Sequence, residues 1–541
     1  MKLNKLFTFA LAALALGACS NDDELTNGGG NPEPGQGSLV DAISISFANS
    51  TGSKTRASMG EIDGTGTENQ VYVAYVFARE NDPQHDGKKL GDWTVKRVVK
   101  TGESDTDDTL VSNPITDGNV ATPGTKGNMC TFNGVQQGDS VYVIVNDPNM
   151  NMATANTLAH KGDKSQASIR AYVSTLAKDY LNGLSVAKDG AQTGKFIMAG
   201  ATAIPTNPNT PNGGTVIVPV SLDREVAKVF FNASVTTDIQ YEAAGKVTLK
   251  DATSPADADG MLIVRIPNRV SPFTLQARDW YFPLSGDNTT KDWDVAAWMS
   301  PFDGDGESAP TVAPVGDVKA FNVAPFQATA KEYRLTWKIK DADPATAPTS
   351  KVYLNDGKMY SPYFYVTPNY ANHSGCGTVI ITQATYTGDN ILLEATITDE
   401  MLAAAVADAT FSAATSIADV KNIKADTWNT QANLDALVTF LASVPTYNSI
   451  FRGATVAADQ ATAISIKKGD KRFYRADVAN MSDDEATSMK LTERNTFYHI
   501  TGTITTLGAK SIEDAINSDD ISMIVQVEVK KWNYVVNNVN M

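Results

Sequence analysis

Apolar positions along the chain fall mostly in short runs rich in Val, Ile, Thr and Tyr, and Gly, Asn, Asp and Pro separate these runs. This pattern predicts many short β-strands joined by turns, as in a β-sandwich. The clearest predicted strands are 71–78, 140–146, 195–199, 215–222, 226–235, 260–266, 332–339, 363–367, 378–386, 390–397, 496–505 and 521–530. We therefore expect an all-β fold.

Two stretches have the helical period instead. Residues 165–181 place apolar side chains three and four positions apart, and residues 433–443 repeat this spacing, which predicts amphipathic helices. Together with 399–408, the second stretch predicts a helical insert at about 398–447, which Pro445 would end.

Prolines at positions 205, 208 and 211 precede a fresh β run that begins at Val216. Because such punctuation is typical of a connection between structural units, we expect a boundary near residue 221. The sequence then predicts an N-terminal β-sandwich domain over 57–220 and a C-terminal one over 221–530, with the helical insert in the second.

The N-terminus has the features of an export signal. Lys2 and Lys5 precede an apolar run at 6–16 that is too short to span a membrane. Its end, Leu16-Gly17-Ala18-Cys19, resembles a bacterial lipobox. We expect a lipoprotein signal peptide over 1–18 and lipidation of Cys19; the alternative is an ordinary signal peptide followed by a chance cysteine.

Residues 19–38 follow as a tether. They begin with a short acidic stretch, SNDDE at 20–24, that resembles the surface-export tag of lipoproteins in Bacteroidota-type bacteria. Residues 27–37 contain only Gly, Pro, Asn, Gln and Glu, a composition typical of flexible linkers.

The next segment has the pattern of a one-sided strand. In 39–47, Ile43, Ile45 and Phe47 alternate with serines. The polar stretch behind it ends at Arg56, the only arginine among the first 70 residues, in a segment that should be exposed and easily nicked. Cleavage between Arg56 and Ala57 would free residues 39–56 as a propeptide; the alternative is an ordinary surface arginine.

The C-terminus contains a second extended segment. Met523, Val525, Val527 and Val529 share one face, and the parity changes at the lysines 530 and 531. The apolar pattern continues afterwards on even positions, at Trp532, Tyr534 and Val536. A parity change predicts a bulge or a new strand. Residues 531–541 are therefore predicted to form a separate tail. For residues 521–530, the alternative is an ordinary final strand of the domain.

Composition narrows the classes of function. The 541 residues carry 45 basic and 61 acidic side chains, so the net charge of −16 argues against nucleic acid and anionic membranes as general partners. Four histidines and three cysteines make a zinc enzyme or a disulfide-stapled scaffold a poor fit. Cys130 and Cys376 are expected to be small buried side chains, with a disulfide as the alternative.

Motifs of enzyme sites are missing from the sequence. It contains no metalloprotease, C-x-x-C, serine hydrolase or P-loop pattern. The acidic stretch at 303–307 has the spacing of a calcium loop but lacks the glycine and the final glutamate. We therefore expect a protein that is not an enzyme, with no catalytic residues, no metal site and no cofactor.

Several motifs occur in the order known from one family. They are the lipobox, Lys54-Thr55-Arg56-Ala57, GDSVYVIVN at 138–146, FIMAG at 196–200, VPVSLDREVAKV at 218–229, YFYVTPN at 363–369, Arg494-Asn495 with Tyr498 and Gly508, and MIVQVEVKKW at 523–532. In this the chain resembles the type V pilins, the fimbrillins of Bacteroidota-type bacteria, and most closely the minor-fimbria shaft subunit. Residues 398–447 have no counterpart in that family.

The resemblance implies two transthyretin-like β-sandwich domains and a mechanism of assembly. A lipoprotein precursor would reach the outer membrane, and a trypsin-like Arg-specific protease would cut after Arg56. The C-terminal segment of another subunit would then fill the groove that the first strand leaves. Its donor residues would be Met523, Val525, Val527, Val529, Trp532, Tyr534 and Val536. Identical subunits, a fimbrial anchor and a tip subunit are the implied partners, and the cell-surface fimbrium, with a role in adhesion, is the implied location.

Strand addition suits such an assembly physically, because it satisfies main-chain groups and buries an apolar stripe at once. An alternative class is a surface lipoprotein that binds glycans, or an accessory fimbrial subunit. A glycan-binding module would need an exposed row of aromatic side chains.

Overall fold

The structure is a computed structural model. It describes residues 39–48, 61–63, 71–80, 93–99, 130–176, 180–184, 195–205, 215–250, 260–264, 266–267, 269–273, 313–314, 321–322, 335–336, 338–339, 353–355, 357–361, 363–369, 377–394, 396–408, 431–451, 453–479, 492–511, 514–515 and 523–533.

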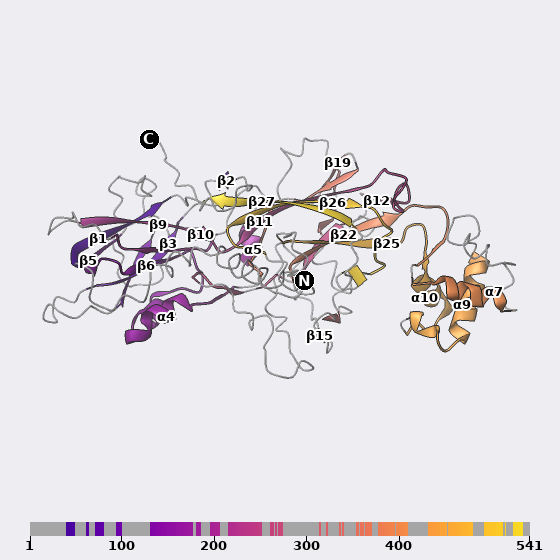
Figure 1. Ribbon diagram of the computed structural model, residues 1–541, viewed down its shortest axis with the longest axis horizontal. Coiled ribbons are helices and arrows are strands. Elements are labelled where there is room, and N and C mark those ends of the chain that lie inside the picture. The colour runs from indigo at the N-terminus through magenta and orange to yellow at the C-terminus, as the bar shows by residue number, and fades with distance from the viewer. Residues whose placement is uncertain are drawn as a thin grey trace, which may run out of the picture.

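Two sheets face each other in the N-terminal part (Figure 1). One has the order β5-β1-β9 and the other the order β10-β8-β6-β3-β4. Their bounds are β1 Leu39–Ala48, β3 Val73–Arg79, β4 Trp93–Val99, β5 Thr131–Gln136, β6 Ser140–Val145, β8 Met198–Ala203, β9 Thr215–Ser221 and β10 Asp223–Arg224. The facing sides bury Ile45 and Val218 in the same cluster as Val76 and Val143.

Short helices cover the other face of the five-stranded sheet. They are α3 (Met152–Ala159), the 3₁₀ turn η1 (Gly162–Lys164) and α4 (Ser165–Arg170). Tyr75 and Phe77 of β3 pack against them in a separate cluster. Strand β3 is therefore covered on both faces, which explains why its sequence is a continuous apolar run rather than an alternation.

The single helix predicted at 165–181 is wrong. Helix α4 ends at Arg170, and strand β7 (Ser174–Thr175) and helix α5 (Tyr180–Leu184) follow. Strand β7 pairs with β14 (Arg269–Val270), so long-range pairing overrides the local helical period there. Ile169 and Leu176, which the period placed inside, are both buried.

A second pair of sheets forms the C-terminal part. One has the order β18-β19-β20-β11-β26-β27-β2 with β21 also on β11, and the other has the order β12-β22-β13-β17 with β25 on β22. The bounds are β2 Glu61–Asp63, β11 Ala227–Val235, β12 Val247–Thr248, β13 Gly260–Val264, β17 Leu335–Thr336, β18 Lys338–Ile339, β19 Tyr353–Asn355, β20 Lys358–Tyr360, β21 Phe364–Val366, β22 Val379–Tyr386, β25 Lys471–Asp477, β26 Thr496–Ile504 and β27 Met523–Asn533. Strands β15 (Ala313–Pro314) and β16 (Phe321–Asn322) form a separate pair. The expected all-β fold with few helices is confirmed.

The expected helical insert is present at the far end of the molecule (Figure 1). It contains α7 (Asp399–Ala407), α9 (Gln431–Ser443), η5 (Asn448–Phe451) and α10 (Ala457–Ile464), and thus extends beyond the predicted end at 447. Leu402, Leu437 and Ile464 belong to a hydrophobic cluster of its own. The insert enters from β23 (Leu392–Leu393) and leaves through β24 (Ser465–Ile466), which pair with each other.

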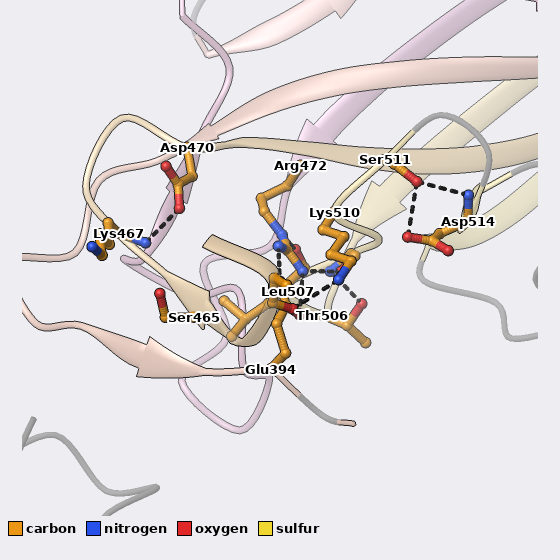
Figure 2. A network of polar contacts seen from close by, with 12 residues as sticks. Glu394, Ser465, Lys467, Asp470, Arg472, Thr506, Leu507, Lys510, Ser511 and Asp514 are labelled. Carbon is orange, nitrogen blue, oxygen red and sulfur yellow. Dashed lines mark hydrogen bonds and ion pairs between the residues drawn. The ribbon is translucent and has the colours of Figure 1, made fainter. Parts of the chain in front are cut away.

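A buried ion pair fixes the base of the insert (Figure 2). Arg472 of β25 donates to both carboxylate oxygens of Glu394, at 2.6 and 3.1 Å. Its remaining donors reach the carbonyl oxygens of Leu507, at 2.8 Å, and Gly508, at 2.5 Å. Although it ends the basic run 467–472, Arg472 is buried and cross-links the insert to the sheet.

Candidate strand-exchange site

Strand β1 is the central strand of its sheet. It pairs antiparallel with β5, from Leu39 opposite Gln136 to Ser44 opposite Thr131. On its other edge it pairs parallel with β9, from Ala42 beside Thr215 to Ala48 beside Ser221. Both edges of the predicted propeptide strand are therefore hydrogen-bonded within the chain.

The side chains of β1 complete a hydrophobic core. Ile43 and Ile45 are fully buried, as expected for the apolar face of this segment. They lie opposite Phe132 of β5 and beside Val218 of β9, which are also fully buried. The third predicted residue, Phe47, lies beside Val220 in the register of β9.

Removal of β1 would leave a slot with apolar walls. Val135 of β5 and Val220 of β9 extend the buried face on either side, and Val76 of β3 belongs to the same cluster. The inner edges of β5 and β9 would lose their main-chain partners. Such an edge is a template for another strand.

Glycine 200 brings β8 and β9 into close approach. A Cβ atom at Gly200 would lie 2.0 Å from the carbonyl oxygen of Ser221 and 2.8 Å from a methyl group of Val220. The last position of the FIMAG motif therefore has to be glycine, because a side chain would displace β9. On β9, Pro219 is exposed and has no N–H, which is typical of edge strands.

Cysteine 130 lies at the start of β5 and is a free, buried thiol. Its carbonyl oxygen accepts a hydrogen bond from the amide of Ile45, at 3.1 Å. Burial raises the pKa of this thiol to about 12, so it behaves as a small apolar side chain, as expected. Its possible disulfide partner, Cys376, lies outside the described residues.

The C-terminal segment forms strand β27, which pairs antiparallel with β26 of the same chain. The ladder runs from Met523 opposite Ile504 to Lys531 opposite Thr496 without a bulge. Met523 is fully buried, and Val525 and Val527 pack against the core. Val529 continues the ladder opposite Tyr498.

Strand β27 gains a second partner on its other edge near its end. Strand β2 pairs parallel with β27 from Lys531 to Asn533, where Ile62 lies beside Trp532. The parity change at Lys530 and Lys531 thus coincides with the point where β2 begins to pair with β27, and the ladder with β26 has no bulge there. Tyr534 and Val536 lie outside the described residues.

The predicted processing residues, Cys19, Arg56 and Ala57, also lie outside the described residues. The segment that contains Arg56 and Ala57 connects β1 to β2. Strand β1 belongs to an N-terminal sheet and β2 to a C-terminal one.

Four of the motif residues meet where the N-terminal and C-terminal sheets join. Arg494 lies 3.2 Å from the buried carboxylate of Glu225 and donates to the carbonyl oxygens of Ser271 and Pro272. Asn495 donates to Asp223 at 2.5 Å. The Arg-Asn motif thus ties the start of β26 to the connection between β10 and β11, a structural role.

The sequence pattern does not predict two of the strands that form and support the slot, β5 and β4. Strand β5 contains Asn133-Gly134, which resembles a turn, and β4 contains the polar pair Lys96-Arg97. Only the long-range contacts show that β5 is a wall of the slot and that β4 supports β5. Trp93, by contrast, is buried against Tyr142.

Among the described residues, no group of His, Cys, Asp and Glu side chains could hold a metal ion. In the part of the chain that the structure describes, no helix combines the length and apolar character needed to cross a membrane.

Comparison with known proteins gives one family and several solved structures. Residues 17–231, less than half of the chain, match the model of a family described as a domain of unknown function, DUF5029. No curated protein matches.

Three solved structures are similar over most of this chain. A candidate cell adhesion protein from Bacteroides eggerthii is 13% identical and has a TM-score of 0.39, with 93% of this chain and 98% of that protein covered. The fimbrilin FimA from Porphyromonas gingivalis is 12% identical with a TM-score of 0.37, at 91% and 97% coverage. The tip fimbrial protein Mfa3 from Porphyromonas gingivalis is 8% identical with a TM-score of 0.33, at 91% and 100% coverage. The chain is thus similar to DUF5029 proteins in its N-terminal part and to solved fimbrial and adhesion proteins along most of its length.

Proposed function

We propose that the protein is the shaft subunit of a cell-surface fimbria. It is exported as a lipoprotein precursor through Cys19, held at the outer membrane, and cut after Arg56 by an Arg-specific protease. Release of β1 then opens the slot between β5 and β9, and a C-terminal segment of a neighbouring subunit fills it. The filament serves adhesion to host or bacterial surfaces.

One observation carries this proposal. The segment before Arg56 is the central strand of a sheet, with Ile43 and Ile45 fully buried. An ordinary N-terminal extension would be dispensable, whereas loss of this strand removes core side chains worth roughly 1.5–3 kcal/mol each. A cut after Arg56 would therefore convert a self-complemented monomer into one that needs a strand from elsewhere.

The pairing of β27 with β26 limits which C-terminal residues can act as the donor. Met523, Val525, Val527 and Val529 pair with β26 in the same chain, and their transfer would dismantle the C-terminal sheet. We therefore place the donor in the residues after Lys530, with Trp532, Tyr534 and Val536 as its apolar anchors. Among the described residues, its transfer would break only the pairing of Lys531 with Thr496 and the short ladder of β2 with Lys531, Trp532 and Asn533.

A head-to-tail contact of this kind is heterologous, so it grows open chains rather than closed dimers. A shaft subunit needs both a slot and a donor. A tip needs no donor, and an anchor needs no cleavage site. The combination of Arg56 with the tail after Lys530 favours the shaft role over an accessory subunit.

Limited trypsin treatment tests the proposal. The full chain carrying Cys19→Ser, which cannot be lipidated, is cut and then followed by mass spectrometry and negative-stain microscopy. We expect a new N-terminus at Ala57 and filaments. The Arg56→Ala variant should stay monomeric, and truncation after Lys530 should give folded monomers that are cut but do not assemble. Filaments from the truncated chain would contradict the donor assignment.

A second candidate function is glycan binding by the uncut monomer. Tyr363 is 42% exposed and its ring lies 5.4 Å from that of Phe230, with Lys228 4.6 Å above the Tyr363 ring. Aromatic faces of this kind can stack on sugars. Binding of the uncut chain to a glycan array, lost in Tyr363→Ala, would favour this class.

A further inference from the structure

The outer edge of β5, which faces away from β1, is bound by side chains and not by another strand. β5 is the last strand of its sheet among the described residues, so only β1 pairs with it. The amide of Ile45 donates to the carbonyl of Cys130. Because main-chain groups alternate in direction along an antiparallel strand, those of Cys130 and Phe132 point toward β1, and those of Thr131 and Asn133 point away from it.

Two charged side chains bind the groups that point away. Lys96 of β4 donates to the carbonyl oxygen of Thr131 at 2.5 Å, and the amide of Asn133 donates to the carboxylate of Glu80 at 3.0 Å. Lys96 and Glu80 also form an ion pair at 2.6 Å, with side chains 24% and 20% exposed. Lys96 lies 4.4 Å from the ring centroid of Phe132.

This clamp, Lys96 with Glu80, replaces a neighbouring strand on the outer edge of β5. Charge-assisted hydrogen bonds are stronger than neutral ones, and they occupy main-chain groups that would otherwise be open to another strand. After loss of β1, no other main-chain ladder would hold β5 in the described part of the chain.

We propose that Lys96 and Glu80 are positioning residues of the acceptor slot, which keep β5 extended when β1 has left and leave only its inner edge open to an incoming strand. This inference rests on the proposed strand exchange. It assigns to the clamp a role in the cut protein that it does not have in the uncut one, where β1 already holds β5.

The test uses the full chain carrying Cys19→Ser, cut with limited trypsin, and a fluorescent peptide with the sequence of Leu39–Ala48 as the probe. The variants are Lys96→Met and Glu80→Gln. The matched control is Lys468→Met, which breaks a distant surface ion pair with Asp389. Peptide affinity is measured by fluorescence anisotropy and amide hydrogen exchange of residues 130–136 by mass spectrometry.

We expect both clamp variants to bind the peptide about tenfold more weakly than the wild type, the order of one lost hydrogen bond to a charged group. Amide exchange in 130–136 should rise about tenfold in the cut variants and little in the uncut ones. The control should match the wild type in both measurements.

Equal peptide affinity of variants and wild type would overturn the proposal. So would an equal loss of protection before and after cutting, because that would indicate a merely structural ion pair. Weaker peptide binding by the variants together with a wild type that forms no filaments would uphold the clamp and reject the shaft function. A cut wild type that does not bind the peptide would overturn both.

Discussion

Ile45 of β1 lies beside Val218 of β9 in a parallel ladder, and neither side chain is exposed to solvent. The two residues are far apart in the sequence, so the first strand of the described residues completes a core whose other strands come much later in the chain. This contact makes the stability of the N-terminal sheets depend on a segment that a single cut behind it could release.

Replacement of Ile45 by Ala should therefore destabilise the uncut protein by about 2–5 kcal/mol, the usual cost of a cavity in a core. Denaturant unfolding measures this change. The control is Ile217→Ala on β9, a residue that is 40% exposed, and it should change stability by less than about 0.5 kcal/mol. Similar midpoints for the two variants would mean that β1 does not contribute to the core.

Glycine 200 offers a test of how β8 holds β9. In Gly200→Ala the new methyl group would collide with the carbonyl oxygen of Ser221, so the backbone of β9 must move. We expect a loss of about 2 kcal/mol or more in stability and weaker retention of β1. Gly245→Ala is the matched control: Gly245 has a φ of +70° and open space around its Cβ position, so only the backbone conformation opposes the change, at about 1 kcal/mol. A smaller loss at Gly200 than at Gly245 would contradict the close approach.

The sequence predicted β1 well because its own alternation of Ile and Ser carries the information. The same holds for β3, β6, β9, β11, β22 and β26, which are dense in Val, Ile and Tyr. Local pattern is sufficient where the strand itself is apolar.

The walls of the slot could not be predicted in this way. Strand β5 contains Asn133-Gly134, and its neighbours come from positions around 43 and 96, so its pairing depends on long-range register. The same limit explains α4, which ends early because β7 pairs with β14. Patterns along the chain gave no signal for the Lys96–Glu80 contact either, since two isolated charges resemble any solvated pair.

The buried ion pair at the base of the helical insert gives a further prediction. Arg472→Met should destabilise the protein by about 3–5 kcal/mol, because Glu394 would remain as a buried carboxylate without its partner. The double variant Arg472→Met with Glu394→Met should recover part of this loss, since no isolated charge remains. Denaturant unfolding distinguishes them, with Lys468→Met as a surface control that should leave the midpoint unchanged. A double variant less stable than Arg472→Met would contradict this account.

The junction between the sheets should make stability depend on pH. Burial raises the pKa of Glu225 from 4.5 to about 8, and the nearby carboxylates of Asp223 and Asp147 act in the same direction, while Arg494 acts to lower it. Between these two pH values the folded protein keeps a proton that the unfolded chain has released. The contribution of Glu225 to stability is therefore largest at low pH and falls as the pH rises from about 4.5 to 8.

Comparison with Glu225→Gln isolates this contribution, because glutamine cannot titrate. Unfolding free energies at pH 5, 6, 7 and 8 should show the wild type losing stability relative to the variant, by up to about 1.4 kcal/mol per pH unit. Glu242→Gln, at an exposed carboxylate, should run parallel to the wild type at every pH. A Glu225→Gln curve parallel to the wild type would contradict this account. It would mean that Arg494 keeps Glu225 ionised in the folded protein throughout this range.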